Sequence, residues 1–285
     1  MAEISVTLLG TKGGPAVYPA SDRMPTSSLL QIDDLNIVID CGLGVAAGLV
    51  RAGVHLRDLS VVVITHLHSD HYLELGPLLH TAWTAGLRTP VRIIGPKGLD
   101  AYWYGFLQSM AFDIETRITD EGRPDLAGLV TIEVISDQVM LGDGVLMKAL
   151  RNQHPPIIDS FALRFESDGK SIVFSGDTAP FDGLGAFVEG ADLLVHEAMF
   201  ADGVDRLVAR VGNGERLKQH LEASHTRTED VGALAHRAGV KALALNHLVP
   251  SDDPTISDAD WLATIRSSGY GGPTFIGRDG MLLVV

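Results

Sequence analysis

The stretch Ser60-Val61-Val62-Val63-Ile64-Thr65-His66-Leu67-His68-Ser69-Asp70-His71 decides the fold of this chain. Its first part is an apolar, β-branched run, which predicts a buried strand over residues 60–64. Its second part places three histidines and one aspartate within six residues, directly after that strand. Neutral imidazoles and carboxylates are ligands that Zn²⁺, Mn²⁺ and Fe²⁺ accept. The stretch therefore predicts a metal site at the end of a core strand, in preference to a solvated histidine-rich loop.

The spacing inside this cluster favours two neighbouring metal ions. Residues i and i+2 of an extended segment share one side, so His66 and His68 can bind the same ion. If the chain then turns into a helix, Asp70 and His71 can reach a second ion beside the first.

Composition indicates an ordinary soluble globular chain of 285 residues with a large core. The single cysteine, Cys41, excludes an intrachain disulfide and is expected to be a small buried hydrophobic residue. Neither a signal peptide nor a transmembrane helix is expected, and we predict a cytoplasmic protein. The net charge of −14, with scattered Lys and Arg, counts against a nucleic-acid substrate.

Strands and helices are expected along the whole chain, which has no fixed-period repeat. Strands are predicted near residues 4–9, 28–33, 35–40, 60–64, 91–94, 131–136, 145–151, 160–166, 171–175, 192–196, 241–245, 273–276 and 281–285. Helices are predicted near residues 43–52, 75–85, 98–110, 181–189, 215–222, 227–238 and 257–267, with a capping box at Thr226-Arg227-Thr228-Glu229. Residues 113–130 are predicted to be an exposed connection, and residues 11–28 a long loop beside the metal site. The pattern favours two packed sheets flanked by helices in one domain, residues 1–285.

Three later polar residues share the setting of the cluster, because each follows or ends an apolar strand. His154 follows residues 148–150, Asp177 follows residues 171–174, and His247 follows residues 241–245. Loops at the carboxyl ends of strands gather at one place, so these side chains can converge on the metal pair. Taken singly, they are also compatible with a turn residue, a helix cap and a core histidine. Taken together, they complete two metal-binding spheres.

A further histidine is a candidate general acid. A histidine oriented by a carboxylate can protonate a leaving group. We predict this role for His225, with Glu197 as the orienting carboxylate, against the alternative of a surface histidine at a helix start. The remaining isolated histidines are predicted to be structural or solvent-facing: His55, His80, His220 and His236.

These motifs resemble the metallo-β-lactamase superfamily, whose signature is a His-x-His-x-Asp-His run. The similarity spans nearly the whole chain and includes Gly10-Thr11, Ile39-Asp40-Cys41-Gly42 and Ser175-Gly176-Asp177-Thr178. The chain looks most like the branch that holds the RNase Z endonucleases and their arylsulfatase-like relatives. That branch carries segments that resemble His196-Glu197-Ala198 and Ser224-His225-Thr226.

The resemblance implies an αββα metallo-β-lactamase-like sandwich, which is a layered α/β fold, with a binuclear zinc site. It implies that one zinc is bound by His66, His68 and His154, the other by Asp70, His71 and His247, and that Asp177 bridges them. The implied catalytic residues are Asp70, His225 and Glu197, and metal-bound hydroxide would attack the substrate. The ligand set also admits Mn²⁺ or Fe²⁺.

Three departures bear on the substrate. Glu74 stands where the family usually has glycine, and could contact a cluster histidine or alter the pocket. The segment His247-Leu248-Val249-Pro250 differs from the endonucleases' usual His-Phe-Ser-x-Arg-Tyr. A glycine- and lysine-rich arm for holding tRNA is also not found in the sequence. The altered segment at residues 247–250 removes expected RNA-facing residues, and with the missing arm and the charge of −14 it counts against a tRNA substrate.

The sequence therefore leads us to expect a metal-dependent hydrolase of a small-molecule ester, sulfate ester, lactone or cyclic amide. The alternative is a ribonuclease Z-like phosphodiesterase that cleaves tRNA 3′ ends, which predicts a basic groove near the metals. A non-catalytic metal-binding protein is a third hypothesis, and the complete ligand set argues against it. The expected partner is a small-molecule substrate, with nucleic acid disfavoured. A homodimer is suggested only by the resemblance.

Overall fold

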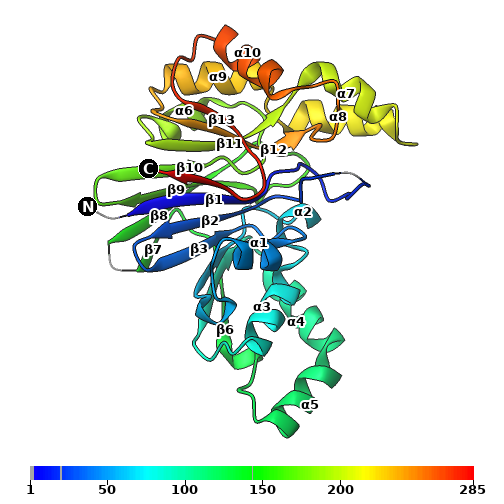
Figure 1. Ribbon diagram of the computed structural model, residues 1–285, viewed down its shortest axis with the longest axis vertical. Helices are drawn as coiled ribbons and strands as arrows, with labels where there is room; N and C mark the ends of the chain where they lie inside the picture. The colour runs from blue at the N-terminus through cyan, green and yellow to red at the C-terminus, as the bar shows by residue number, and fades with distance from the viewer. Residues whose placement is uncertain (1–2, 20, 143) are drawn as a thin grey trace.

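Two β-sheets lie face to face in the centre of the molecule and carry helices on their outer faces (Figure 1). The structure is a computed structural model that describes residues 3–19, 21–142 and 144–285. This arrangement confirms the predicted layered α/β sandwich. Among the described helices, none is long and apolar enough to cross a membrane.

Each sheet has seven strands in the described part of the chain. The first sheet runs, in spatial order, β14 (Met281–Val284), β1 (Ile4–Gly10), β2 (Ser27–Ile32), β3 (Leu35–Ile39), β4 (Val61–Val63), β5 (Val91–Gly95) and β6 (Val130–Val134). The second runs β13 (Thr274–Ile276), β12 (Leu243–Val249), β11 (Leu193–Met199), β10 (Lys170–Phe174), β9 (Phe161–Ser167), β8 (Val145–Arg151) and β7 (Gln138–Gly142).

The strands are apolar on both sides because both faces of each sheet are covered. In β4, Val61 and Val63 belong to the core between the sheets, whereas Val62 packs under the outer helices. This two-sided burial explains why residues 60–64 form an uninterrupted apolar run. The termini also meet within the first sheet, where β1 pairs antiparallel with β14 and Ser5 lies opposite Val284.

Two layers of helices cover the sheets (Figure 1). The layer on the first sheet contains α1 (Val45–Arg51), α3 (Leu75–Thr84) and α4 (Leu99–Ser109), and α5 (Ala111–Glu121) projects beyond it. The layer on the second sheet contains α6 (Asp182–Val188), α9 (Thr228–Arg237) and α10 (Asp258–Ser267). The remaining helices are the short α2 (Ser69–Tyr72), α7 (Ala201–Val208), α8 (Gly214–Ser224) and the 3₁₀ turns Leu56–Asp58 and Ala127–Leu129.

Residues 113–130 differ from the predicted exposed connection, because their whole first half, residues 113–121, belongs to helix α5. The helix is polar outside, and Arg117 bonds Asp113 and Glu121 one turn away on either side. Strand β7 and helix α7 were also absent from the predicted pattern.

The predicted capping box at residues 226–229 is wrong. Thr226 donates its hydroxyl to Thr178 O at 2.6 Å, and helix α9 has no side-chain cap. A capping box occurs instead at α10, between Ser257 and Asp260.

Candidate metal centre and active site

The predicted ligands gather where strands of both sheets end. The cluster follows β4, Asp177 follows β10, and His154 follows β8. His247 lies within β12 and adopts a left-handed backbone conformation with φ 43°. Non-glycine residues rarely adopt this conformation, and such strain is concentrated at functional sites. The sandwich therefore brings together side chains that are up to 181 residues apart, counted from His66 to His247.

His66, His68 and His154 form a first group of ring nitrogens. His68 Nδ1 lies 3.1 Å from His66 Nε2 and 3.0 Å from His154 Nε2. In a tetrahedral site with Zn–N bonds near 2.05 Å, ligand nitrogens lie about 3.3 Å apart. The observed spacing is close to this value, so the donor set fits a metal ion.

Asp70, His71 and His247 form a second group beside the first. His247 Nε2 lies 3.2 Å from Asp70 Oδ2, and His71 Nε2 lies 3.6 Å from the same oxygen. All three side chains are buried. Two imidazoles and one carboxylate converging in this way also suit a divalent metal ion.

Asp177 lies between the two groups. Its Oδ2 is 3.1 Å from His247 Nε2, 3.3 Å from His71 Nε2 and 3.7 Å from His66 Nε2. Its Oδ1 is buried without a hydrogen-bond partner among the described residues. An unpaired oxygen here is consistent with a carboxylate that contacts two ions at once.

Burial controls the protonation of the first group. It lowers the pKa of His66 well below its usual value and lowers the pKa of His154 to about 4. Both imidazoles are therefore neutral near pH 7, which is the form that binds metal ions. Burial raises the pKa of Asp177, but His247 and His71 outweigh this effect and hold that pKa well below the usual range.

Neighbouring groups fix the orientation of the predicted ligands. Asp40 Oδ2 lies 2.8 Å from His71 Nδ1, and Asp40 Oδ1 accepts the Thr65 backbone N–H at 2.8 Å. His154 Nδ1 lies 2.9 Å from Ser224 O. Hydrogen bonds to the second ring nitrogen set the tautomer of a metal-binding histidine. Asp40 is recognisable in the sequence as part of the motif Ile39-Asp40-Cys41-Gly42, but no role was predicted for it.

The long loop after β1 also reaches the centre. Gly14 N–H donates to Asp70 Oδ2 at 2.8 Å. A Cβ atom built on Gly13 would lie 2.9 Å from His247 Cε1 and 2.5 Å from Val249 Cγ2. Glycine is required there because the loop backbone passes directly against a candidate ligand.

His225 and Glu197 pair as predicted beside this centre. His225 Nδ1 lies 2.8 Å from Glu197 Oε2, and Glu197 Oε1 accepts the Thr178 N–H at 2.6 Å. Burial lowers the pKa of His225, but the adjacent Glu197 outweighs it and raises that pKa to about 9. One ring nitrogen of His225 lies within 4.8 Å of ligand atoms of Asp177 and His247. A protonated His225 is therefore placed where a proton can be delivered.

Two residues differ from their predicted surroundings. His220 was assigned no place in the site, but its ring centroid lies 5.7 Å from that of His68 and 5.9 Å from that of His225. Glu74 does not contact a cluster histidine. Its carboxylate accepts the N–H groups of Gly44 and Ala46 and so caps helix α1.

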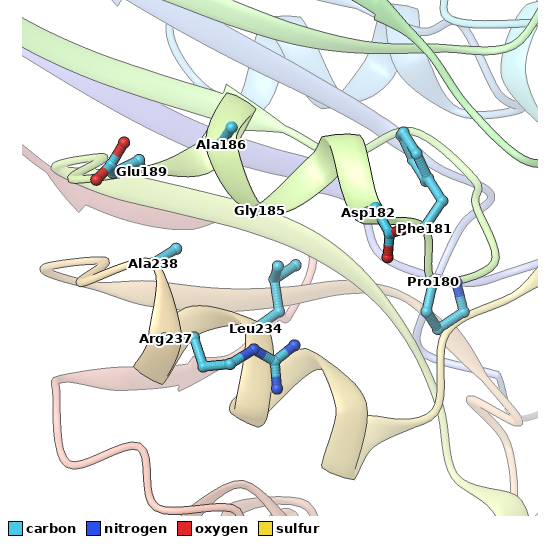
Figure 2. A pocket seen from close by; sticks show the side chains of 9 residues that line it. All are labelled: Pro180, Phe181, Asp182, Gly185, Ala186, Glu189, Leu234, Arg237 and Ala238. Carbon is cyan, nitrogen blue, oxygen red and sulfur yellow. The ribbon is translucent and has the colours of Figure 1, made fainter.

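A cavity of about 290 Å³ opens onto the centre and is lined by Asp70, Asp177 and His225. A larger cavity of about 500 Å³ lies between α6 and α9, where Figure 2 shows Arg237 and Leu234 across from Asp182. Its lining contains none of the predicted ligands. We therefore place the substrate in the smaller cavity.

Comparison with known proteins identifies the family. A family model described as "Beta-lactamase superfamily domain" matches residues 35–248. The chain belongs to this superfamily. As a superfamily member with a His/Asp cluster, it is a metal-dependent hydrolase with a divalent metal site, which confirms the coarser sequence prediction.

Curated relatives of this superfamily member carry a specific name. A protein named Ribonuclease Z from Mycobacterium bovis (strain BCG / Pasteur 1173P2) is 34% identical over 97% of this chain and 96% of its own length. A Ribonuclease Z from Mycolicibacterium gilvum (strain PYR-GCK) is 34% identical over 97% of this chain and 94% of its own length.

Solved structures support the superfamily fold. The metallo-beta-lactamase fold protein YhfI from Bacillus subtilis has a TM-score of 0.73 at 22% identity and covers 99% of this chain and 100% of its own. The short form of human tRNase Z has a TM-score of 0.68 at 21% identity and covers 98% of each chain. At these identities the likeness concerns the fold.

The near-full-length relatives overturn two expectations. The main hypothesis of a small-molecule ester, sulfate ester, lactone or cyclic amide substrate is wrong, as is the expectation that nucleic acid is disfavoured. The physical reason is that a net charge of −14 averages over the whole surface, whereas substrate binding depends on the local field. Divalent cations bound in the centre would offset its carboxylates locally. The arylsulfatase-like part of the resemblance stays a prediction.

Proposed function

We propose that this protein is a ribonuclease Z-like phosphodiesterase that cleaves RNA at a tRNA 3′ end. The observation that carries the proposal is 34% identity over 97% of the chain to relatives named Ribonuclease Z. The buried histidine–carboxylate pair beside the metal centre supports it, because phosphodiester cleavage requires protonation of a leaving oxygen.

The ligand assignment is part of this proposal. The first ion would be held by His66, His68 and His154, and the second by Asp70, His71 and His247, with the Asp177 carboxylate available to both. We propose zinc for both ions, since imidazole and carboxylate donors at tetrahedral spacing suit it. When bound, two such ions supply an activated water and neutralise charge that develops on the phosphate.

His225 is the proposed proton donor. Its Nδ1 is held by Glu197, so Nε2 is the nitrogen left to face a bound substrate. Glu197 is in turn fixed by the Thr178 N–H and by its position in β11. The pair therefore keeps the imidazole protonated and correctly turned, and the imidazole gives its proton to the departing oxygen of the RNA.

The test uses purified metal-loaded protein with a precursor tRNA that carries a 3′ trailer. We expect cleavage at the trailer junction, loss of cleavage with a chelator, and recovery when zinc is returned. His225→Ala should slow cleavage by about 100-fold or more, the usual contribution of a general acid. His236→Ala, on the exposed side of α9, is the matched histidine control. Intact precursor after prolonged incubation with loaded wild-type protein would overturn the proposed function.

A further inference from the structure

A lysine in the loop after β1 is fixed between the two sheets beside the metal centre. Lys12 N–H donates to Met24 O at 3.0 Å, and the next residue, Gly13, donates to Leu248 O at 3.1 Å. Leu248 N–H donates to Thr11 O at 2.9 Å, which pairs the segment with the residue after His247. The backbone of Lys12 is therefore held from both sides, and its side chain has a defined position.

The Lys12 residue is nearly buried, and its ammonium group has no carboxylate partner among the described residues. The residue is 5% exposed, and within the described part of the chain Nζ has two hydrogen-bond contacts, both long and to neutral oxygens: Gly13 O at 3.4 Å and Ser251 Oγ at 3.5 Å. Burial lowers the pKa of Lys12, and the acidic groups that oppose this effect are Asp252 and Asp70. Both have other partners, since Asp252 bonds Arg210 through two contacts of 3.1 Å, and Asp70 belongs to the metal centre.

A buried cation with no anion is unfavourable, and proteins normally pair such groups. Lys12 lines the same 290 Å³ cavity as Asp70, Asp177 and His225. The Tyr18 ring lies over its ammonium, with Nζ 5.5 Å from the ring centroid. A neighbouring cavity of about 460 Å³ shares the lining residues Tyr18 and Leu207 with the first. The missing anion is therefore expected to enter from the cavity.

We infer that Lys12 is a substrate-binding residue that contacts a non-bridging oxygen of the phosphodiester at the metal centre. The identity of this anion rests on the proposed function. The ammonium supplies a local positive charge at the cavity, although the net charge of the whole chain is −14. A lysine acts on phosphate as a point charge, so its contact strengthens binding of substrate and transition state alike.

The experiment compares Lys12→Met, which keeps the apolar stem, with Lys12→Gln and Lys12→Arg. Lys170→Met is the matched control, because Lys170 begins β10, at the end opposite to Asp177, and the substitution changes net charge equally. KM and kcat are measured on the precursor RNA over a series of salt concentrations. The same constants are measured on bis(p-nitrophenyl) phosphate, a small phosphodiester. Melting temperatures are recorded for every variant.

We expect Lys12→Met and Lys12→Gln to raise KM for RNA by about tenfold or more, with kcat changed little. The slope of log KM against log salt should fall by about 0.7, the value for one phosphate contact on a single strand. Lys12→Arg should recover most of the affinity. The melting temperature of Lys12→Met should not fall, because a buried unpaired charge has been removed.

Each other outcome has a definite meaning. Cleavage of RNA with unchanged KM in the neutral variants overturns the inference and leaves the proposed function standing. A raised KM for the small diester without any RNA cleavage supports the inference and overturns the proposed function. Failure of the wild type on both substrates overturns both. A lowered melting temperature with unchanged salt dependence would make Lys12 a structural residue.

Discussion

Asp40→Asn should weaken binding of the second metal ion selectively. Asp40 accepts hydrogen bonds at both oxygens, from Thr65 N–H at 2.8 Å and from His71 Nδ1 at 2.8 Å. An asparagine that keeps its oxygen on Thr65 must turn its NH₂ toward His71. Nδ1 would then have to accept, which moves the ring proton to Nε2 and removes the lone pair that faces the centre. Asparagine tolerates the left-handed backbone of Asp40, φ 61°, so the backbone is not strained.

The expected loss of metal affinity can be worked out from the usual contribution of an orienting hydrogen bond. Removing a partner that orients a metal-binding histidine weakens metal affinity by about 10- to 100-fold, or roughly 1.4–2.7 kcal/mol. Asp40 contacts His71 directly but reaches His66 only through the Thr65 hydroxyl, so the site of His66, His68 and His154 should keep most of its affinity. Metal content is measured after dialysis against a graded series of chelator concentrations. The variant should lose one ion per chain at concentrations where the wild type retains two.

Asp192→Asn is the matched control, because Asp192 is also buried and bonds Ser171 N–H and Lys241. Ser171 lies at the start of β10 and Lys241 lies just before β12, so both partners are at the strand ends opposite to the metal centre. Asp192→Asn should leave the number of ions bound at each chelator concentration unchanged. Two ions retained by Asp40→Asn with wild-type affinity would refute the tautomer argument. Equal loss of both ions would show that Asp40 supports the fold of the whole centre instead.

Three further predictions concern single contacts. The rate of RNA cleavage should fall as pH rises through about 9, because His225 then loses the proton that it donates. The Glu197→Gln variant should show this fall at lower pH. An unchanged pH profile in the variant would contradict the pairing of Glu197 with His225. Gly13→Ala should lower metal-dependent activity at least about tenfold by displacing His247, with metal content as the check. Glu74→Ala should lower the free energy of unfolding by about 1 kcal/mol through loss of a helix cap, measured by urea denaturation, with metal content unaffected.

The sequence indicated the layers of the fold well because each carries a local signal. The apolar run at residues 60–64 predicts a strand covered on both sides, and β4 is buried on both faces. Helix α5 was missed because it lacks such an apolar signal. Its polar, charged surface resembles a loop, and the ion pairs of Arg117 that stabilise it become visible only when the helix is formed.

Site residues that directly follow an apolar strand could be predicted from the sequence. Contacts between segments that are remote in sequence could not. His154, Asp177 and His247 each stand out after an apolar run, and the structure brings them to the cluster. His220 carries no such signal, since its contacts join segments that are remote in sequence. Asp40 does follow the apolar strand β3 directly, but the sequence does not show that its carboxylate faces His71. The assignment of individual ligands stays a prediction until metal binding is measured.

The substrate was misjudged because charge was summed over the chain. A total of −14 says nothing about one buried ammonium at one cavity. Electrostatic attraction acts over roughly 10 Å at 0.1 M salt, so the distribution near the site decides which anions enter.

The pairing of β1 with β14 has a consequence for biosynthesis. Because Ser5 lies opposite Val284, the outer edge of β1 has no neighbour while nearly all of the chain is being translated. An open strand edge is a template for pairing with other chains. The outer edge of β1 therefore stays open to such pairing until β14 emerges and pairs with it, after which β14 forms the edge of the sheet.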